Sequence, residues 1–515
     1  MMNGANTANF DYRLEPTKEA FPTLIVSANG REQALHSKMF PSKETTAMEA
    51  ELSPDGADIF VILGVGLGYH LKPIEACLTA YKQIVLLDVF ADASKLIAKA
   101  KFAEFVLAAD NISLIAGLSP AQTAEKLAAL INIDASARIK VICHPASMRV
   151  FNDYYTALLA SVESIINQKA GSIATAKAFG RRYIKNSIEN IARLSQQKPV
   201  KALFGKAAGA PAAVLASGPT LENSMPCLAA NADKLFIVAA DSALPVCLAY
   251  GILPDITVSV DPQPYVWEHL AASIYKHPLR IATSFCGYAW KFADICETFL
   301  SLNTHPFAQL AEERFPDTFG SINSGAGSVA GDALALALAC GCAPIACCGY
   351  DFAFERGLTY CRGTAYQNRN STLFANRLNS AETANLRYIM NSSGAVKANG
   401  IFTRKNFLQY KAAAEHTFAG KPLVQISPVV PMEGVSHLHS LQTFVDEYCS
   451  ADINKAEFTT AASAARPISE IINAGELARL TLDKAIFAEL LRRSLSDGES
   501  KESADLYAFA RQRLA

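Results

Sequence analysis

The chain has 515 residues, of which 50% are hydrophobic and 18% are charged. A chain of this length exceeds a single hydrophobic core, and we predict roughly three domains. The formal net charge is −1 at pH 7. This value argues against a strongly basic surface of the kind that attracts nucleic acids and anionic membranes.

The sequence also argues against export and membrane anchoring. Residues 1–16 carry acids and lack an apolar core, so we expect neither a signal peptide nor an anchor. The longest apolar run, residues 333–350, contains Gly341 and Pro344, which favours a buried helix and a buried strand over a membrane span. The twelve cysteines lack the spacing of a disulfide scaffold, and we interpret them as buried thiols of a cytoplasmic protein.

The first part of the chain alternates strands with helices. After a short strand at 24–27, apolar runs predict strands at 59–63, 84–87, 112–115 and 139–143, an alternation typical of a parallel sheet. The turn Gly64-Val-Gly-Leu-Gly68 follows the first of these runs, and Asp88 lies at the end of the second. This pattern is typical of dinucleotide-binding turns, but it also occurs in domains without a ligand, so ligand binding here stays open.

Residues 148–197 have a mostly helical pattern, with an expected break near Gly171. The basic stretch 179–186 within it is interpreted as a linker helix with a solvated basic face. A second α/β unit begins near Lys201. Its expected strands are 212–216, 235–240, 256–260, 280–283, 299–302 and 345–348, enough for a doubly wound sheet that binds its ligand at the carboxyl ends of the strands.

The turn Ser217-Gly218-Pro219 joins the first of these strands to a helix. Gly218 allows close backbone approach, Pro219 presets the first helical turn, and the free N–H groups of a helix start bind anions. We predict that this turn holds the phosphate of a nucleotide-activated donor. The alternative is an ordinary strand-to-helix turn.

Further polar features fall at the same predicted edge of the sheet. Asp241 and Asp261 follow strands, and the segment Ser324-Gly-Ala-Gly-Ser-Val-Ala-Gly-Asp332 leads into a helix rich in small residues. Because the carboxyl ends of parallel strands meet at one edge, we expect these residues to line one nucleotide site.

Residues 352–402, called the lid below, are polar and irregular, and a loop of this length in a compact domain is usually functional. A helix at 406–418 and a strand at 423–426 follow, and the tail 467–515 has a helical pattern broken at 496–498. The predicted fold class is α/β, with two Rossmann-like doubly wound units and a helical C-terminal region. The predicted domains are an N-terminal Rossmann-like domain at 1–170, a central nucleotide-binding domain at 171–440 and a helical domain at 441–515.

Several motifs together carry a resemblance to one family. They are Leu35-His-Ser-Lys38 with Pro41 and Glu44, the Gly64 turn, His144-Pro145 with Phe151, Phe179-Gly-Arg-Arg182, Ala216-Ser-Gly-Pro-Thr-Leu221, Ala240-Asp-Ser-Ala-Leu244, Gly251-Ile-Leu-Pro-Asp-Ile-Thr-Val-Ser-Val-Asp-Pro-Gln263 and residues 324–351. In this order and spacing they resemble the Maf (motility-associated factor) proteins, the flagellin glycosyltransferases.

The resemblance implies transfer of a nonulosonic acid, such as pseudaminic or legionaminic acid, from a CMP-linked donor to Ser or Thr of flagellin, in support of flagellum assembly and motility. It implies no required cofactor, with Mg²⁺ left open. It also implies a central domain similar to bacterial sialyltransferases and to the hydroxymethylpterin pyrophosphokinase-like domain. The residues that it assigns to the donor are Ser217, Gly218, Pro219, Thr220, Ser324, Gly325, Ser328 and Tyr360.

Three departures from the sialyltransferase pattern leave the general base open. Ser217 replaces an asparagine, Ala353 replaces the first of two tyrosines, and no histidine follows the lid until His416. Attack by an acceptor hydroxyl needs a base, and carboxylates at strand ends suit that role. The candidates are Asp261, Asp241 and Asp351, each of which can equally be a helix cap or turn residue, while His416, His437 and His439 are weaker.

Two other functions stay open. The passage from Val238 to Asp261 also resembles pyrophosphokinases for thiamine or hydroxymethylpterin, which transfer diphosphate from ATP with Mg²⁺ held by carboxylates. Those enzymes have paired acids at the last position, whereas this chain has Asp261 alone, which favours the glycosyltransferase. A non-catalytic partner of flagellin is the third interpretation.

Overall fold

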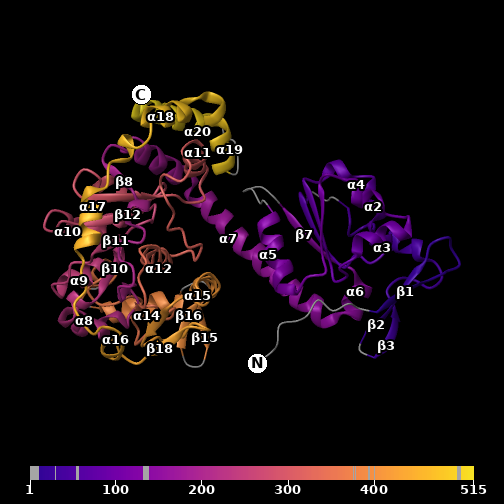
Figure 1. The fold of residues 1–515 in the computed structure, drawn as a ribbon, viewed down its shortest axis with the longest axis horizontal. Coiled ribbons are helices and arrows are strands. Elements are labelled where there is room, and N and C mark those ends of the chain that lie inside the picture. Colours follow the sequence, from indigo (N-terminus) through magenta and orange to yellow (C-terminus); the bar gives the residue numbers. More distant parts are fainter. Residues whose placement is uncertain are drawn as a thin grey trace. The chain divides into compact units, whose positions relative to one another are not determined.

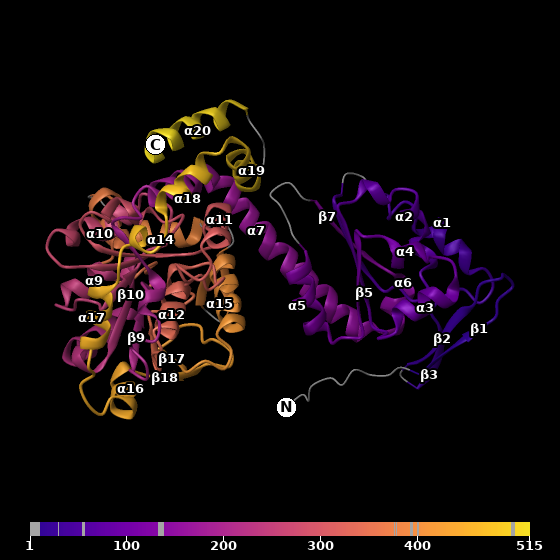
Figure 2. The same cartoon turned by 45° about the horizontal axis from the view of Figure 1, so that its top comes forward.

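The computed structural model describes residues 11–28, 30–53, 57–131, 138–374, 376, 378–391, 395–398, 401–495 and 500–515. By internal packing the chain forms two compact units, Met1–Ala178 (unit 1) and Phe179–Ala515 (unit 2), each built around a parallel sheet (Figures 1 and 2). The predicted fold class is confirmed. The division into three domains stays a prediction.

Unit 1 contains a four-stranded parallel sheet in the order β6-β5-β4-β7. Its strands are β4 (Ile59–Leu63), β5 (Gln83–Asp88), β6 (Ile112–Ala116) and β7 (Ile139–Cys143), as the apolar runs predicted. Helices α3 (Ala93–Ala100) and α5 (Pro120–Leu130) pack against this sheet. A smaller antiparallel sheet of β1 (Tyr12–Glu15), β2 (Thr23–Ala28) and β3 (Arg31–Ala34) joins the same core through Leu24 and Val26.

One long helix, α7 (Asn152–Ile191), belongs to both units. It buries Tyr155 in the core of unit 1 and Ile184 and Ile188 in the core of unit 2. The predicted break near Gly171 is wrong, because the helix runs through that residue. A single interior glycine costs about 1 kcal/mol relative to alanine, and the buried contacts at both ends of the helix outweigh that cost.

Unit 2 contains a nine-stranded sheet in the order β18-β17-β14-β9-β10-β11-β12-β13-β8, with every pair parallel. The strands are β8 (Gln197–Pro199), β9 (Ala212–Leu215), β10 (Phe236–Ala240), β11 (Ile256–Val258), β12 (Arg280–Ser284), β13 (Glu297–Ser301), β14 (Ile345–Cys348), β17 (Leu423–Ile426) and β18 (Ser436–Leu438). The sequence predicted all but β8 and β18, which are three-residue strands at the two edges.

Helices cover both faces of the unit 2 sheet. Alternate side chains of each strand point to opposite faces, so Val214 and Val238 pack against α12 (Val329–Ala339). Leu215 and Ile237 pack on the other face with α8 (Leu221–Ala230), α9 (Leu244–Ala249) and α16 (Leu441–Tyr448). This arrangement is the doubly wound sheet that the sequence predicted.

The lid contains more regular structure than predicted. It forms α13 (Ala365–Arg369), a π-helical turn (Asn370–Phe374), α14 (Ala381–Asn391), β15 (Ala395–Ala398) and β16 (Ile401–Arg404), and α15 (Lys405–Thr417) follows. Its polar side chains bind one another: Gln367 Nε2 donates to Thr359 Oγ1 and to Asn385 Oδ1, both at 3.1 Å. The prediction that the lid is irregular is wrong. The lid helices are held by hydrogen bonds between buried polar side chains, so the sequence lacks the apolar stripe from which helices are predicted.

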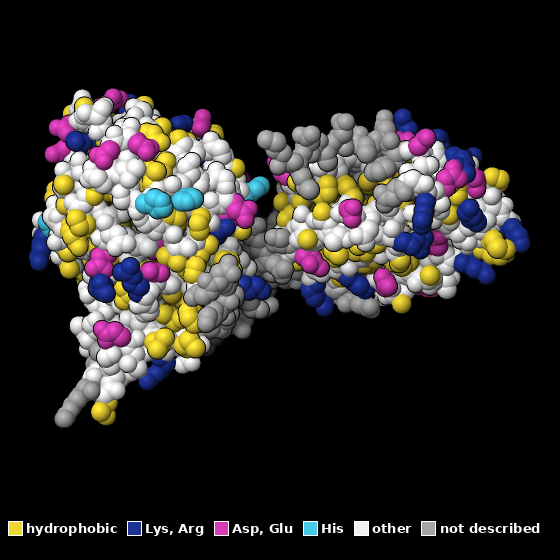
Figure 3. Space-filling view, turned by 90° about the horizontal axis from the view of Figure 1, so that it is seen from below, with side chains coloured by type: hydrophobic (Ala, Val, Ile, Leu, Met, Phe, Trp, Pro, Cys, Tyr) yellow, Lys and Arg dark blue, Asp and Glu magenta, His cyan; other side chains and the backbone are white. Residues whose placement is uncertain are grey.

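The C-terminal helices α18 (Ala474–Leu482), α19 (Lys484–Ser494) and α20 (Ser500–Leu514) pack at one end of unit 2 with the last turns of α7 and with α11 (Pro306–Arg314) (Figure 1). The predicted break at 496–498 lies outside the described residues. All twelve cysteines are free thiols. None of the helices in the described part of the chain has the length and apolar character that crossing a bilayer requires. Basic and acidic side chains are interspersed on the face drawn in Figure 3.

Candidate functional site

The glycine turn after β9 lies directly against the end of β14. Gly218 N–H donates to the carbonyl of Gly349 at 3.1 Å. A Cβ atom at Gly218 would lie 2.3 Å from that carbonyl oxygen, and one at Gly349 would lie 2.4 Å from the carbonyl oxygen of Ala216. The predicted close backbone approach at Gly218 is therefore an approach to the neighbouring strand.

Asp351, three residues beyond β14, caps the start of α8. Its Oδ2 accepts from the Thr220 N–H at 2.8 Å and its Oδ1 accepts from Thr220 Oγ1 at 2.5 Å. The side chain is buried, and burial raises the pKa of Asp351 to about 6. The amide of Thr220, a residue that the resemblance assigns to the donor, thus already binds a carboxylate of the protein.

A chain of hydroxyls and one carboxylate connects the ends of β9, β10 and β11. Asp241 Oδ1 accepts from the Ser242 N–H and its Oδ2 accepts from Ser259 Oγ, both at 2.7 Å. Ser242 Oγ in turn donates to Ser217 Oγ at 2.9 Å. Both oxygens of the buried Asp241 are therefore engaged, and the predicted site residue Ser217 belongs to the same network.

Asp261 differs from the other two predicted acids because it is only half-buried. Its Oδ1 accepts from the Gln263 N–H at 2.7 Å. Burial raises the pKa of Asp261 to about 6; the Gln263 amide opposes this rise, the charge of Asp241 adds to it, and Arg182 of α7 opposes it. Asp261 is thus the candidate that a substrate hydroxyl can reach and that titrates just below neutral pH.

Two tyrosines of the lid stack on each other, and the charges of these acids act on their pKa values. The rings of Tyr360 and Tyr366 are stacked, with centroids 4.4 Å apart. Burial raises the pKa of Tyr360 to about 12, and the charge of Asp261 contributes to the rise. Burial also raises the pKa of Tyr366, with contributions from Tyr360 and from the charges of Asp241 and Asp261. Both hydroxyls therefore stay protonated at neutral pH and are hydrogen-bond donors.

The second predicted segment forms the start of α12. Ser324 N–H and Oγ both donate to Asp332 Oδ1, at 2.8 and 2.7 Å, and Ser328 Oγ accepts from the Gly331 N–H at 3.1 Å. Gly325 has a positive φ of 69° and open space around it. Tyr350 Oη donates to the Ala330 carbonyl at 2.8 Å, so the residues after β14 touch both predicted helix starts.

The basic stretch at the end of α7 is anchored to this edge of the sheet. Asn186 Nδ2 donates to the carbonyl of Pro262 at 3.0 Å and to that of Cys286 at 2.8 Å. Asn190 Nδ2 donates to the carbonyl of Phe285 at 2.9 Å. The interpretation as a linker with a solvated face is incomplete, because the opposite face of this stretch fixes the turns after β11 and β12.

Sequence reasoning missed four residues of the site. Arg404, at the end of β16, donates from Nη1 to Oη of the lid residue Tyr388 at 2.7 Å. Tyr366 contacts the ring of His269, which is buried in α10 (Val266–Ile274), at a centroid distance of 4.9 Å. The available signal for Tyr366 was its place six residues after Tyr360. Nothing in the sequence around His269 or Arg404 distinguishes either residue.

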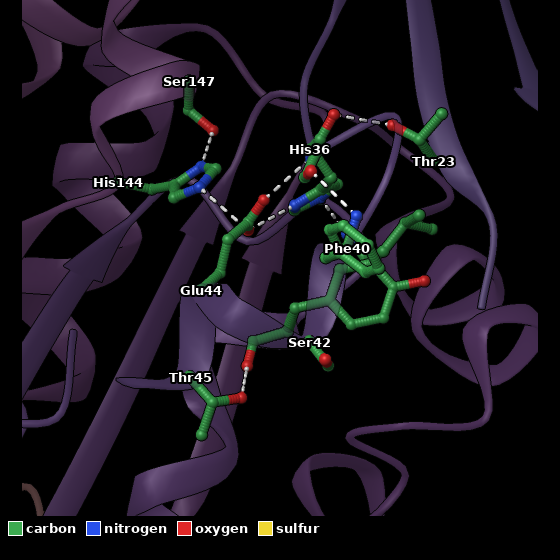
Figure 4. A network of polar contacts seen from close by, with 12 residues as sticks. Thr23, His36, Phe40, Ser42, Glu44, Thr45, His144 and Ser147 are labelled. Carbon is green, nitrogen blue, oxygen red and sulfur yellow. Dashed lines mark hydrogen bonds and ion pairs between the residues drawn. The ribbon is translucent and has the colours of Figure 1, made fainter. Parts of the chain in front are cut away.

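Unit 1 holds the one group in the described residues that could hold a metal ion: His36, Glu44 and His144 (Figure 4). Glu44 Oε2 lies 2.7 Å from His36 Nδ1 and 3.7 Å from His144 Nε2, and Ser147 Oγ lies 2.8 Å from His144 Nδ1. However, His36 Nε2 accepts from the Leu67 N–H at 2.9 Å, so the ring proton is on Nδ1. A metal ligand at Nδ1 would have to lose that proton, so His36 does not fit as a ligand.

The N–H groups of the glycine turn in unit 1 already donate hydrogen bonds to a carboxylate of the same unit. Asp88 Oδ2 accepts from the N–H groups of Val65 at 2.6 Å and Gly66 at 2.9 Å. A Cβ atom at Gly64 would lie 2.4 Å from the Cβ of Ser147, so the turn is also packed from outside. Asp88 therefore fills the place where the dinucleotide pattern would position a phosphate.

Three comparisons with known proteins bear on this arrangement. The family model described as 6-hydroxymethylpterin diphosphokinase MptE-like matches residues 185–357. An uncharacterized protein from Treponema pallidum (strain Nichols) is 34% identical over 85 residues, which is 16% of this chain and 40% of that relative. The solved structure of the MAf glycosyltransferase from Magnetospirillum magneticum AMB-1 has a TM-score of 0.58 and 13% identity, and the match covers 95% of this chain and 88% of that one.

These findings agree with the two resemblances drawn from the sequence. The chain has the fold of the MAf glycosyltransferase over nearly its whole length. The MptE-like match falls on the first part of unit 2, from the end of α7 to the start of the lid. It therefore includes the glycine turn, Asp241, Asp261 and the start of α12.

Proposed function

We propose that the chain is a glycosyltransferase that moves a nonulosonic acid, such as pseudaminic or legionaminic acid, from a CMP-linked donor to Ser or Thr of flagellin in the cytoplasm. The fold shared with the MAf glycosyltransferase supports this proposal. The observation that carries it is Asp261, a half-buried carboxylate just beyond β11 whose pKa lies near 6 and whose charge raises the pKa of the lid residue Tyr360.

Asp261 acts as the general base. With a pKa of about 6 it is largely ionised at neutral pH. As the acceptor oxygen forms its bond to the anomeric carbon, the bond from that carbon to the phosphate oxygen breaks, and the acceptor proton passes to Asp261. Asp241 and Asp351 stabilise the site instead, because each has both carboxylate oxygens engaged.

The leaving phosphate is stabilised by hydrogen-bond donors. Tyr360 and Tyr366, whose pKa values the charge of Asp261 helps to raise, supply two hydroxyls. The turn at Ser217 and the start of α12 at Ser324 and Gly325 supply the walls of the donor site. In a partly desolvated site such donors stabilise developing negative charge more than they do in water.

A Mg²⁺-dependent diphosphokinase is the second candidate, favoured by the MptE-like match over residues 185–357. Such enzymes need several carboxylate oxygens free to hold Mg²⁺. In unit 2 Asp241 is engaged by Ser242 and Ser259, which leaves Asp261 as the accessible acid. This engagement favours the glycosyltransferase.

Calorimetric titration with CMP and with ATP, each with and without Mg²⁺, separates the candidates. We expect CMP to bind without added metal and ATP to bind weakly under both conditions. Mg²⁺-dependent ATP binding without CMP binding would instead identify the diphosphokinase. Binding of neither nucleotide, together with capture of flagellin, would identify a non-catalytic partner.

A further inference from the structure

Asn186 of α7 is buried, and its side-chain amide binds the segments that follow β11 and β12. Nδ2 donates to the carbonyl of Pro262 at 3.0 Å and to that of Cys286 at 2.8 Å, and Oδ1 accepts from Trp290 Nε1 at 3.0 Å. Both N–H groups and the oxygen are therefore engaged, which determines the orientation of the amide.

Pro262, one of these partners, directly follows the proposed base. The Asp261 carbonyl accepts from the Tyr288 N–H at 3.0 Å, and Asp261 Oδ1 accepts from the Gln263 N–H at 2.7 Å. The next carbonyl, that of Pro262, is held by Asn186. Among these three hydrogen bonds, the one from Asn186 is donated by a side chain, so a substitution can remove it without changing the loop sequence.

Asn186 also reaches Asp261 by a second route. Cys286, the other acceptor of Asn186 Nδ2, lies two residues before Tyr288, whose N–H binds the Asp261 carbonyl. Asn186 therefore holds the peptide after Asp261 directly and the donor to the Asp261 carbonyl through the turn after β12.

Asn190, one turn further along α7, has the same chemistry without this contact. It is fully buried, its Nδ2 donates to the carbonyl of Phe285 at 2.9 Å, and its Oδ1 accepts from Gln197 Nε2 at 2.7 Å. In the described part of the chain its side-chain hydrogen bonds go to the turn after β12 and to β8, and not to the loop of Asp261. The two asparagines thus differ in whether they bind the loop of the proposed base.

We propose that Asn186 is a positioning residue that holds Asp261 where its carboxylate accepts the proton of the acceptor hydroxyl. This inference rests on the proposed function and extends it from Asp261 to the α7 side chain that fixes the loop of Asp261. A displacement of about 1 Å at a catalytic group can reduce a rate about 10²-fold, so loss of a hydrogen bond to the adjacent carbonyl is expected to affect the rate.

The test compares Asn186→Leu with Asn190→Leu by the rate of glycosylation as a function of pH. Both variants leave buried carbonyls unpaired, so both should lower the melting temperature. We expect Asn186→Leu to lower kcat about 10- to 100-fold and to change KM less than about twofold, whereas Asn190→Leu should change either constant less than about threefold. The acidic limb of kcat/KM, which Asp261 sets near pH 6 in the wild type, should move to lower pH in Asn186→Leu alone, because a released carboxylate is better solvated.

A double substitution separates positioning from general destabilisation. In the Asp261→Asn background the proposed base is already absent, so adding Asn186→Leu should lower the rate less than about twofold. Trp290→Phe removes the donor to Asn186 Oδ1 but keeps an aromatic ring, and it replaces Asn186→Leu if that variant does not fold. We expect Trp290→Phe to lower kcat about two- to fivefold, with a smaller shift of the acidic limb.

The other outcomes would overturn the assignment. An unchanged kcat and pH profile in folded Asn186→Leu, or equal changes in Asn186→Leu and Asn190→Leu, would show that Asn186 only stabilises the fold. An undiminished loss in the Asp261→Asn background would show that Asn186 does not act through Asp261. If Asn186→Leu does not fold, an unchanged kcat in Trp290→Phe would overturn the proposal. These results leave the proposed function intact, whereas a wild-type protein without glycosylation activity would overturn that function and this inference with it.

Discussion

The two α/β units have the same kind of glycine turn after a buried strand, but they differ in what surrounds that turn. Each unit places a glycine turn at a strand end and engages its amides with its own carboxylate: Asp88 binds Val65 and Gly66 in unit 1, and Asp351 binds Thr220 in unit 2. A glycine turn at the end of a β-strand is therefore not evidence of an open phosphate site in this chain.

The units differ in what surrounds the turn. In unit 1 the segment after β3 closes over it, with His36 accepting from the Leu67 N–H and donating to Glu44. In unit 2 the corresponding edge keeps a half-buried acid, Asp261. Accessible polar groups around the turn, rather than the turn itself, distinguish a candidate active site from a structural one.

The largest expected effect comes from the acids of the two units. Asp261→Asn removes the proposed base, and we expect the glycosylation rate to fall about 10³-fold, within the range for general base catalysis, with little change in the melting temperature. Asp88→Asn, the matched change in unit 1, leaves two turn amides poorly bonded and should lower the stability of unit 1 without lowering the rate of the folded protein. Steady-state rates and thermal unfolding of both variants check this contrast. A normal rate in Asp261→Asn would mean that Asp261 is structural.

A smaller effect is expected from the glycine that contacts the neighbouring strand. Gly218→Ala places a Cβ atom 2.3 Å from the backbone oxygen of Gly349, and we expect the free energy of unfolding of unit 2 to fall by about 2 kcal/mol. Gly325→Ala meets no atom within 4 Å, so only its positive φ opposes the change, at about 1 kcal/mol. Chemical denaturation measures both variants. Equal losses would show that the contact with Gly349 relaxes at no cost.

The sequence predicted what local patterns determine. Continuous apolar runs located the interior strands of both sheets, and the rule that parallel strands share a carboxyl edge placed Asp241 and Asp261 in one region. The edge strands β8 and β18 were missed because each is three residues long and contains polar side chains. The lid helices were missed because the contacts that hold them, such as Gln367 with Asn385, are polar.

Contacts between segments that are far apart in the sequence could not be predicted from local sequence patterns. Thr220 and Asp351 are separated by 131 residues, and no local pattern indicates that one caps the helix of the other. The same holds for Asp241, whose second oxygen is engaged by Ser259, the residue after β11. Which of several acids is free for chemistry depends on such pairings, so the sequence supplied the candidates and the structure separated them.

The smallest expected effect is a difference in how the two units respond to acid. Burial lowers the pKa of His70 and His144 in unit 1. As the pH falls, these histidines are therefore protonated in the unfolded chain at a higher pH than in the folded chain. Their contribution to stability is complete above the unfolded pKa of about 6.5 and is lost as pH falls below it. In unit 2 burial raises the pKa of Asp261 and Asp351 to about 6. Their burial penalty grows as pH rises from about 4 to 6, so acidification relieves it. This relief offsets the loss from His305, the one histidine in the described part of unit 2 whose pKa burial lowers, to about 3.

Hydrogen exchange at pH 7.5 and pH 5.5, corrected for the intrinsic exchange rates, measures this difference unit by unit. We expect protection in β4, β5 and β7 to fall on the order of tenfold at the lower pH, the change that a shift of one pKa unit produces, while protection in β9, β10 and β14 stays constant or rises. His70→Leu replaces a fully buried ring whose nitrogens have no hydrogen-bond partner within the described residues. This variant should therefore reduce the pH dependence of unit 1 and leave that of unit 2 unchanged. A parallel loss of protection in both units would contradict the assignment of opposite proton linkage, because it would mean that the acids of unit 2 do not offset its buried His305.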